Sequence, residues 1–174
     1  MGIQFETDYN METLTAMAKS LRKTVRKKRS RRVHIFAAVV LILGLLTILA
    51  TTAGGEPLGA SGVVTLLAML VVILVSLFED KLNAWFARKR LLPGTEHAAA
   101  TFEEDGYVSA TGVTESRFSY AQIVAVAETE RYFVFALSSH HTQAYDKRTI
   151  RGGSLEDFRA FIAEKTGKLV EDIK

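Results

Sequence analysis

The sequence predicts an α-helical hairpin that spans a membrane and carries a small α+β domain. Two runs, residues 33–52 and 60–78, contain no Asp, Glu, Lys or Arg. Each is close to the ~20 residues that an α-helix needs to cross a hydrocarbon core about 30 Å thick. A chain in lipid must satisfy its own backbone hydrogen bonds, so two isolated spans are expected to be helices. From Thr95 onward, apolar and polar residues alternate, which is typical of strands.

The charges of the chain are distributed unevenly. The net charge is +3 over 174 residues. Residues 1–90 hold 13 Lys and Arg against 6 Asp and Glu, whereas residues 91–174 hold 9 against 13. The basic excess therefore lies beside the apolar runs, and the acidic C-terminal half is not expected to bind nucleic acid. The chain has no cysteine, which excludes disulfides, thiolate metal sites and thiol nucleophiles.

Residues 1–32 are expected to form a short strand followed by a basic amphipathic helix. Residues 3–7 alternate between apolar and polar, and within residues 11–25 the apolar positions recur at helical spacing. No Gly or Pro interrupts this segment, so the helix is expected to continue directly into the first span. Its polar face carries a basic collar, which consists of Arg22, Lys23, Arg26, Lys27, Lys28, Arg29, Arg31 and Arg32.

The basic collar has two interpretations, and both place it in the cytoplasm. It is a topology signal, or it also binds anionic lipid head groups at ~1 kcal/mol per residue near the surface. Nine Lys and Arg precede the first span at residues 33–52, residues 51–62 contain none, and four follow the second span by residue 90. Positively charged flanks stay inside, so both termini are expected to be cytoplasmic and the turn at 53–59 extracytoplasmic.

The second helix is expected to continue beyond the bilayer. Its apolar stripe extends the element to residues 60–92, and Pro93-Gly94 ends it. Trp85 and Phe86 lie in this extension, and we expect them to anchor the helix at the membrane interface or to pack against the soluble domain.

Residues 95–174 are expected to form the α+β domain. The dipeptide Asp105-Gly106 indicates a hairpin, because both residues tolerate positive φ. Strand character is found in six short segments, residues 97–102, 107–113, 115–120, 123–128, 132–138 and 143–147.

A final helix is expected to complete the domain. Ser154 with Asp157 three residues later is typical of a helix start, and Gly167 is typical of a helix end. Its apolar face includes Phe158, Phe161 and Ile162. Antiparallel strands followed by one amphipathic helix predict a curved antiparallel sheet closed by that helix, an arrangement similar to the pleckstrin-homology fold. The same pattern also fits other small α+β domains.

Four stretches of this domain form a recognisable pattern. They read TFEEDGYVSATG, SRFSYAQIVAVAETERYFVFALS, YDKRTI and SLEDFRAFIAEK. In this order, behind an N-terminal segment and two spans, they resemble the YcxB-like family. The resemblance implies a bacterial inner-membrane protein with a cytosolic, pleckstrin-homology-like domain. It implies no enzymatic activity, because the family has no established biochemical function.

Residue patterns typical of catalysis or metal binding are not found. The four histidines lack metal-ligand spacing. Ser138 and Ser139 beside His140 lack the sequence context of a hydrolase nucleophile. Neither apolar run contains a charge that would mark an ion pathway. We therefore expect no catalytic residue, metal or cofactor, and we expect the strand aromatics to form a core: Phe118, Tyr120, Tyr132, Phe133 and Phe135.

Lys147, Arg148 and Arg151 lie together where the last predicted strand ends. They either bind a lipid head group or an acidic peptide, since Arg offers bidentate geometry, or they form a solvated strand end.

The leading hypothesis is a non-enzymatic, membrane-tethered interaction module at the cytosolic face of the inner membrane. Its expected partners are the bilayer, anionic lipid head groups and a membrane or cytosolic protein. One alternative is an immunity-type or accessory subunit that acts within the bilayer on another membrane protein, and another is an enzyme.

Overall fold

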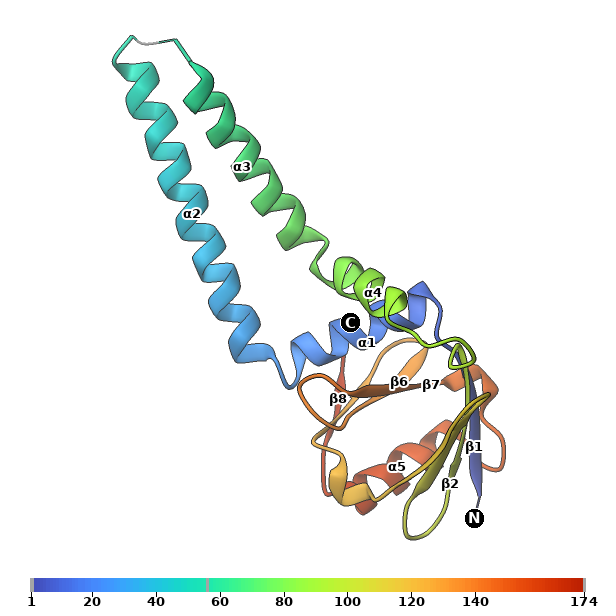
Figure 1. Cartoon of the computed structure of the whole chain (residues 1–174). Helices are drawn as coiled ribbons and strands as arrows, with labels where there is room; N and C mark the ends of the chain where they lie inside the picture. Colours follow the sequence, from blue (N-terminus) through green and yellow to red (C-terminus); the bar gives the residue numbers. More distant parts are fainter. Residues whose placement is uncertain (1, 56, 174) are drawn as a thin grey trace.

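Two long apolar helices project from a β-rich domain in the computed structural model, which describes residues 2–55 and 57–173 (Figure 1). They are α2 (Lys27–Ala53) and α3 (Ala60–Leu77). Both are long and apolar enough to span a membrane, and the apolar stretch of each is entirely unburied. The two apolar helices predicted from the sequence are therefore present, and their outward-facing side chains suit a lipid environment.

The N-terminal strand belongs to the β-rich domain. Strand β1 (Ile3–Asp8) pairs antiparallel with β2 (His97–Phe102), with Phe5 opposite Ala100. Everything between these strands, including the hairpin, is therefore an insertion between two neighbours of one sheet. The sequence indicates the strand but not its partner, and the structure adds it to the C-terminal domain.

The domain contains two four-stranded sheets. The first has the order β1-β2-β3-β4, and the second has the order β7-β6-β5-β8. The strands not yet introduced are β3 (Tyr107–Thr111), β4 (Glu115–Phe118), β5 (Ala125–Glu128), β6 (Tyr132–Ala136), β7 (Thr142–Asp146) and β8 (Val170–Asp172).

Two sheets take the place of the single antiparallel sheet that the sequence predicts. All pairs are antiparallel except β5 and β8, which are parallel. Strand β8 was not predicted, because three residues are too few to display an alternation. The sheets do not close into a barrel but meet along β1 and β7, where the Asp146 amide donates to Thr7 Oγ1 at 3.0 Å.

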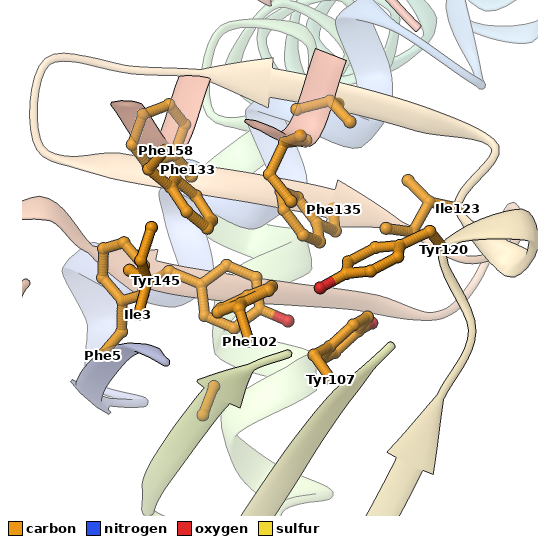
Figure 2. Packing of buried hydrophobic residues seen from close by; sticks show 13 residues of the cluster. Ile3, Phe5, Phe102, Tyr107, Tyr120, Ile123, Phe133, Phe135, Tyr145 and Phe158 are labelled. Carbon is orange, nitrogen blue, oxygen red and sulfur yellow. The ribbon is translucent and has the colours of Figure 1, made fainter. Parts of the chain in front are cut away.

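The C-terminal helix α5 (Leu155–Thr166) supplies the centre of the core. Phe158 is fully buried, and its ring centroid lies 4.7 Å from that of Phe5, 4.8 Å from that of Phe102 and 5.0 Å from that of Phe133. Figure 2 shows these rings converging from both sheets and the helix. One aromatic helix residue thus joins the strands of the two sheets, as the predicted apolar face requires.

The helix boundaries and the aromatic core are confirmed. Ser154 caps α5 in a reciprocal capping box with Asp157, and Gly167 ends the helix in the left-handed conformation at φ 61°. Four of the five predicted core aromatics are buried, and Phe118 packs against them while partly exposed.

The β2–β3 hairpin is present at Asp105-Gly106, but for a different reason from the one predicted. No non-glycine residue in the described chain has a positive φ, and Gly106 does not have one either. A Cβ atom on Gly106 would lie 2.5 Å from the Phe118 carbonyl oxygen. The glycine is therefore required by this close approach.

Helix α1 (Met11–Lys23) packs on the outer face of the second sheet. Ala16 and Met17 contact a small cluster that includes Tyr132 and Ile173. Thr13 Oγ1 donates to the Tyr132 hydroxyl at 3.1 Å. The amphipathic helix therefore covers the sheet as well as leading into α2.

Two helices that the sequence predicts as continuous are each divided in the structure. Helix α1 ends at Lys23 and α2 begins at Lys27, while α3 ends at Leu77 and α4 (Glu79–Lys89) begins after a bend at Phe78. Tertiary contacts explain both breaks, because α1 lies along the sheet and α4 lies along α1. Neither break has a Gly or Pro to reveal it in the sequence.

If β1 is an essential part of the core, Phe5→Ala will destabilise the full-length protein strongly. Phe5 is 1% exposed, and truncating such a Phe costs about 3–5 kcal/mol of unfolding free energy. Denaturant unfolding of the detergent-solubilised protein, followed by near-UV circular dichroism, measures this loss. Leu169→Ala is the control, because Leu169 is 89% exposed and its loss should cost less than about 0.5 kcal/mol. Equal stability of the two variants would contradict the placement of β1.

Candidate functional site

Helices α1 and α4 lie side by side at the foot of the hairpin (Figure 1). Arg22 of α1 binds Asp80 of α4 through two hydrogen bonds, Nε to Oδ1 at 2.7 Å and Nη2 to Oδ2 at 2.6 Å. The Asp80 hydrogen bond raises the pKa of Arg22 above its ordinary value. Glu79 lies 3.9 Å from the same guanidinium. This bidentate pair fixes the two helices in register.

Arg26 connects the start of α2 to the domain. Its Nε donates to the backbone carbonyl of Ser139 at 2.6 Å, in the loop between β6 and β7. Burial lowers the pKa of Arg26, and the nearby positive charge of Arg29 lowers it further, while Glu79 acts in the opposite direction. The first turn of α2 therefore carries positive charge that neighbouring carboxylates only partly balance.

A cavity of about 650 Å³ lies between helix α1, the first turns of helix α2 and the length of helix α4. It reaches strand β7. Its charged lining is Arg22, Arg26, Arg29, Arg90 and Glu79. The remaining lining is Leu14, Met17, Ala18, Leu21, Ser30, Val33, Asn83, Phe86, Ala87, His140 and Thr142. The cavity is therefore basic on one part of its wall and apolar on another.

The positive charge of the cavity exceeds its negative charge. Among the described residues, neither Arg29 nor Arg90 forms an ion pair, and Arg26 bonds a carbonyl rather than a carboxylate. Glu79 is shared, since its Oε2 also lies 3.7 Å from His34 Nε2. With Arg22 balanced by Asp80 and with Glu79 nearby, two positive charges are left uncompensated around the cavity.

The cavity lies at the boundary between charged and apolar sequence. Val33 is the first residue of the apolar run in α2, and Arg29 lies one turn before it. Phe86 contributes an apolar side chain from α4. In a protein that spans a membrane, this is the depth at which lipid head groups lie.

The structure brings three members of the basic collar together at this cavity, Arg22, Arg26 and Arg29. The other five do not line it, and of these Lys27, Lys28, Arg31 and Arg32 are exposed. Lys23 is the last residue of α1.

Six polar or charged lining residues were not predicted from the sequence as binding residues: Ser30, Glu79, Asn83, Arg90, His140 and Thr142. His140 is distant in the chain and reaches the cavity only through the packing of the β6–β7 loop. The α4 residues did leave a signal, since Asn83, Phe86, Ala87 and Arg90 follow one another at spacings of three, one and three, which places them on one helix face.

The two aromatics predicted as interface anchors are both on α4 and both about half exposed. Their ring centroids lie 5.0 Å apart. Lys89 Nζ lies 3.6 Å from the Trp85 ring centroid, a cation–π geometry. Phe86 lines the cavity, whereas Trp85 does not.

The predicted cluster of Lys147, Arg148 and Arg151 is distributed over three carboxylates. Lys147 is 13% exposed and donates to Glu128 at 3.0 Å. Arg148 pairs with Asp146 at 2.9 Å, and Arg151 lies 3.4 Å from Glu6. Each of these three cations thus has an internal carboxylate partner, and only Lys147 is largely buried.

A second and larger hollow, of about 900 Å³, lies between α1 and the second sheet. Its apolar lining includes Met11, Tyr132 and Ile173. Its charges are mixed, with Lys19 and Lys81 together with carboxylates that include Glu12. Within residues 2–55 and 57–173, no group of three His, Asp or Glu side chains is arranged to hold a metal ion.

Comparison with known proteins identifies one segment of the chain. Residues 102–162 match the family model described as YcxB-like protein. This match confirms the resemblance seen in the sequence, and the two long apolar helices precede it as the two-span layout requires. The matched segment runs from the end of β2 into α5 and omits both β1 and the helical insertion. No curated protein and no solved structure matches the chain.

The ion pairs of Glu128 predict a loss of stability in acid. Hydrogen bonds from Arg159, and then from Lys147, lower the pKa of Glu128 from its ordinary value of 4.5, against the opposing effect of burial. A lowered pKa in the folded state adds stability that is present above 4.5 and is lost as the pH falls through the folded-state pKa.

Denaturant unfolding of the full-length protein from neutral pH to about pH 3 tests this dependence. Glu128→Gln should be less stable than the wild type at neutral pH, and its stability should fall less steeply in acid. Glu130→Gln is the matched control, because Glu130 is exposed two residues away. An acid response of Glu128→Gln as steep as that of the control would exclude Glu128 as its source.

Proposed function

We propose that this YcxB-like protein is a non-enzymatic, membrane-tethered module that binds anionic lipid head groups at the cytosolic face of the bacterial inner membrane. One observation carries the proposal: arginines within or directly beside α1, α2 and α4 line one cavity at the level where the apolar run of α2 begins. Phosphate is the anionic group of a phospholipid, and Arg binds phosphate with bidentate geometry.

The charge distribution supports the orientation. The hairpin turn lacks Lys and Arg, whereas both feet of the hairpin are basic. Because positively charged flanks remain inside, the domain and both termini face the cytosol in this proposal. The cytosolic leaflet is also the one that carries the negative surface potential of anionic lipids.

The fold supports a binding rather than a catalytic role. Two sheets meet at β1 and β7, and a C-terminal helix fills the space between them. This arrangement supports a pleckstrin-homology-like domain as part of the proposal. Their interior is occupied by aromatic rings (Figure 2). The insertion between β1 and β2 then carries both the membrane anchor and the head-group site.

The orientation predicts the labelling of single cysteines in intact cells. The natural chain has no cysteine, so Gly59→Cys and Ser116→Cys each introduce one exposed thiol. A membrane-impermeant maleimide should label Gly59→Cys in intact cells and Ser116→Cys only after lysis. Labelling of Ser116→Cys in intact cells would reverse the orientation.

Head-group binding predicts a lipid-dependent rise in thermal stability, because a ligand stabilises the state that binds it. Phosphatidylglycerol added to the purified protein in neutral micelles should raise the melting temperature more than phosphatidylcholine does. Arg26→Gln with Arg29→Gln should remove most of this difference.

Lys27→Gln with Lys28→Gln is the matched control, since it removes the same charge from collar residues outside the cavity. This control should retain most of the lipid effect. Equal losses in the two double variants would show a general attraction of the collar and no head-group site in the cavity.

A further inference from the structure

We infer that the cavity selects a phospholipid whose head group is a phosphate monoester with two negative charges. This inference deepens the proposed function and depends on it. Three features of the cavity carry it: its uncompensated charge, its neutral polar groups and its position at the edge of the apolar helices.

The uncompensated positive charge of the cavity indicates the negative charge of the ligand that it would bind best. Arg29 lies in the first turn of α2, Arg26 directly precedes α2, and Arg90 directly follows α4. All three line the cavity without a bonded carboxylate among the described residues. Glu79 is the one carboxylate in the lining. The resulting excess of two positive charges is balanced by a dianion, whereas a phosphodiester brings a single negative charge. Opposite charges attract, so a dianion is held more strongly than a monoanion by this excess of positive charge.

The hydrogen-bonding groups of the cavity suit a phosphate that carries only one ester bond, the one to the glycerol of the lipid. Asn83 and Thr142 line the cavity, and their side chains make no hydrogen bond to other described residues. Together with the guanidinium N–H groups they offer donors from α2, α4 and β7. A phosphate monoester has three terminal oxygens to accept such bonds, and a phosphodiester has two.

The apolar part of the lining indicates a lipid in preference to a soluble phosphate. Val33 and Phe86 line the cavity beside the arginines. Both are more than half exposed to the surroundings of the helices. Helices α2 and α3 lie further apart towards the domain than at their connecting turn (Figure 1). A phosphate held by the arginines would therefore leave its glycerol and acyl chains beside apolar side chains at bilayer depth.

The test compares phosphatidic acid with phosphatidylglycerol of identical acyl chains. Each is titrated into the purified full-length protein in neutral micelles, and the rise in melting temperature gives the half-saturating lipid concentration. Phosphatidic acid should saturate at a concentration at least about tenfold lower. The preference should grow as the pH rises through the second phosphate pKa near 6, because the monoester then becomes dianionic.

Arg90→Gln should reduce the preference to less than about threefold, and Arg88→Gln should leave it intact, because Arg88 lies on the same helix outside the cavity. Equal half-saturation by the two lipids would overturn the inference and leave the proposed function standing. Stabilisation no greater than that by phosphatidylcholine would remove the proposed function as well. Glycerol phosphate acting at the same concentration as phosphatidic acid would show a soluble phosphate site and overturn the lipid assignment.

Discussion

The pairing of β1 with β2 is the constraint on which the rest of the structure depends. The chain leaves the domain after Asp8 and returns at His97, and these residues are register partners. The Tyr9 amide donates to the Glu96 carbonyl at 2.7 Å. The side chains of the register pair also meet, with His97 Nδ1 2.8 Å from Asp8 Oδ1. All four helices of the insertion are thus held between two adjacent points. This is why α1 and α4 leave and enter the domain side by side, and why a cavity forms between them.

Helix α1 is held in place mainly by burial. Leu14 and Leu21 are buried, and full burial of a Leu side chain contributes about 1.5–3 kcal/mol. The ion pair of Arg22 with Asp80 is partly exposed, and such pairs contribute about 0–1 kcal/mol. Its role is therefore geometric, because the bidentate contact sets the register of α4 on α1. Arg90, directly after α4, takes its position at the cavity from that register.

The charged residues of this protein serve two different purposes, which their partners distinguish. Lys147 and Arg159 converge on Glu128, whose two oxygens accept hydrogen bonds from both. These cations stabilise the domain. Arg29 and Arg90, by contrast, line a cavity without a carboxylate of their own among the described residues. In the proposed placement at the membrane, a cation without an internal partner is available to a ligand, and this contrast underlies the functional proposal.

The elements of the fold were largely predictable from local sequence. The strand at residues 97–102 and the final helix with its Ser154 start and Gly167 end were found as predicted. The two apolar helices needed only their length and composition, because a long uncharged apolar run has few alternatives. Strand β8 was not predicted because it is short. The helix breaks at Thr24–Arg26 and at Phe78 were not predicted because no local sequence feature causes them.

The sequence by itself determined most of the helical and extended segments and where positive charge accumulates, because periodicity and composition act over a few neighbouring residues. Only the tertiary structure decided that β1 joins a strand 89 residues later, and that Lys147 is internally paired while Arg90 lines a cavity. Contacts between distant residues form only when the whole core of two sheets and α5 assembles. The sequence alone therefore does not distinguish a basic residue that stabilises the fold from one that is available to a ligand. Its neighbours in the folded structure make that distinction.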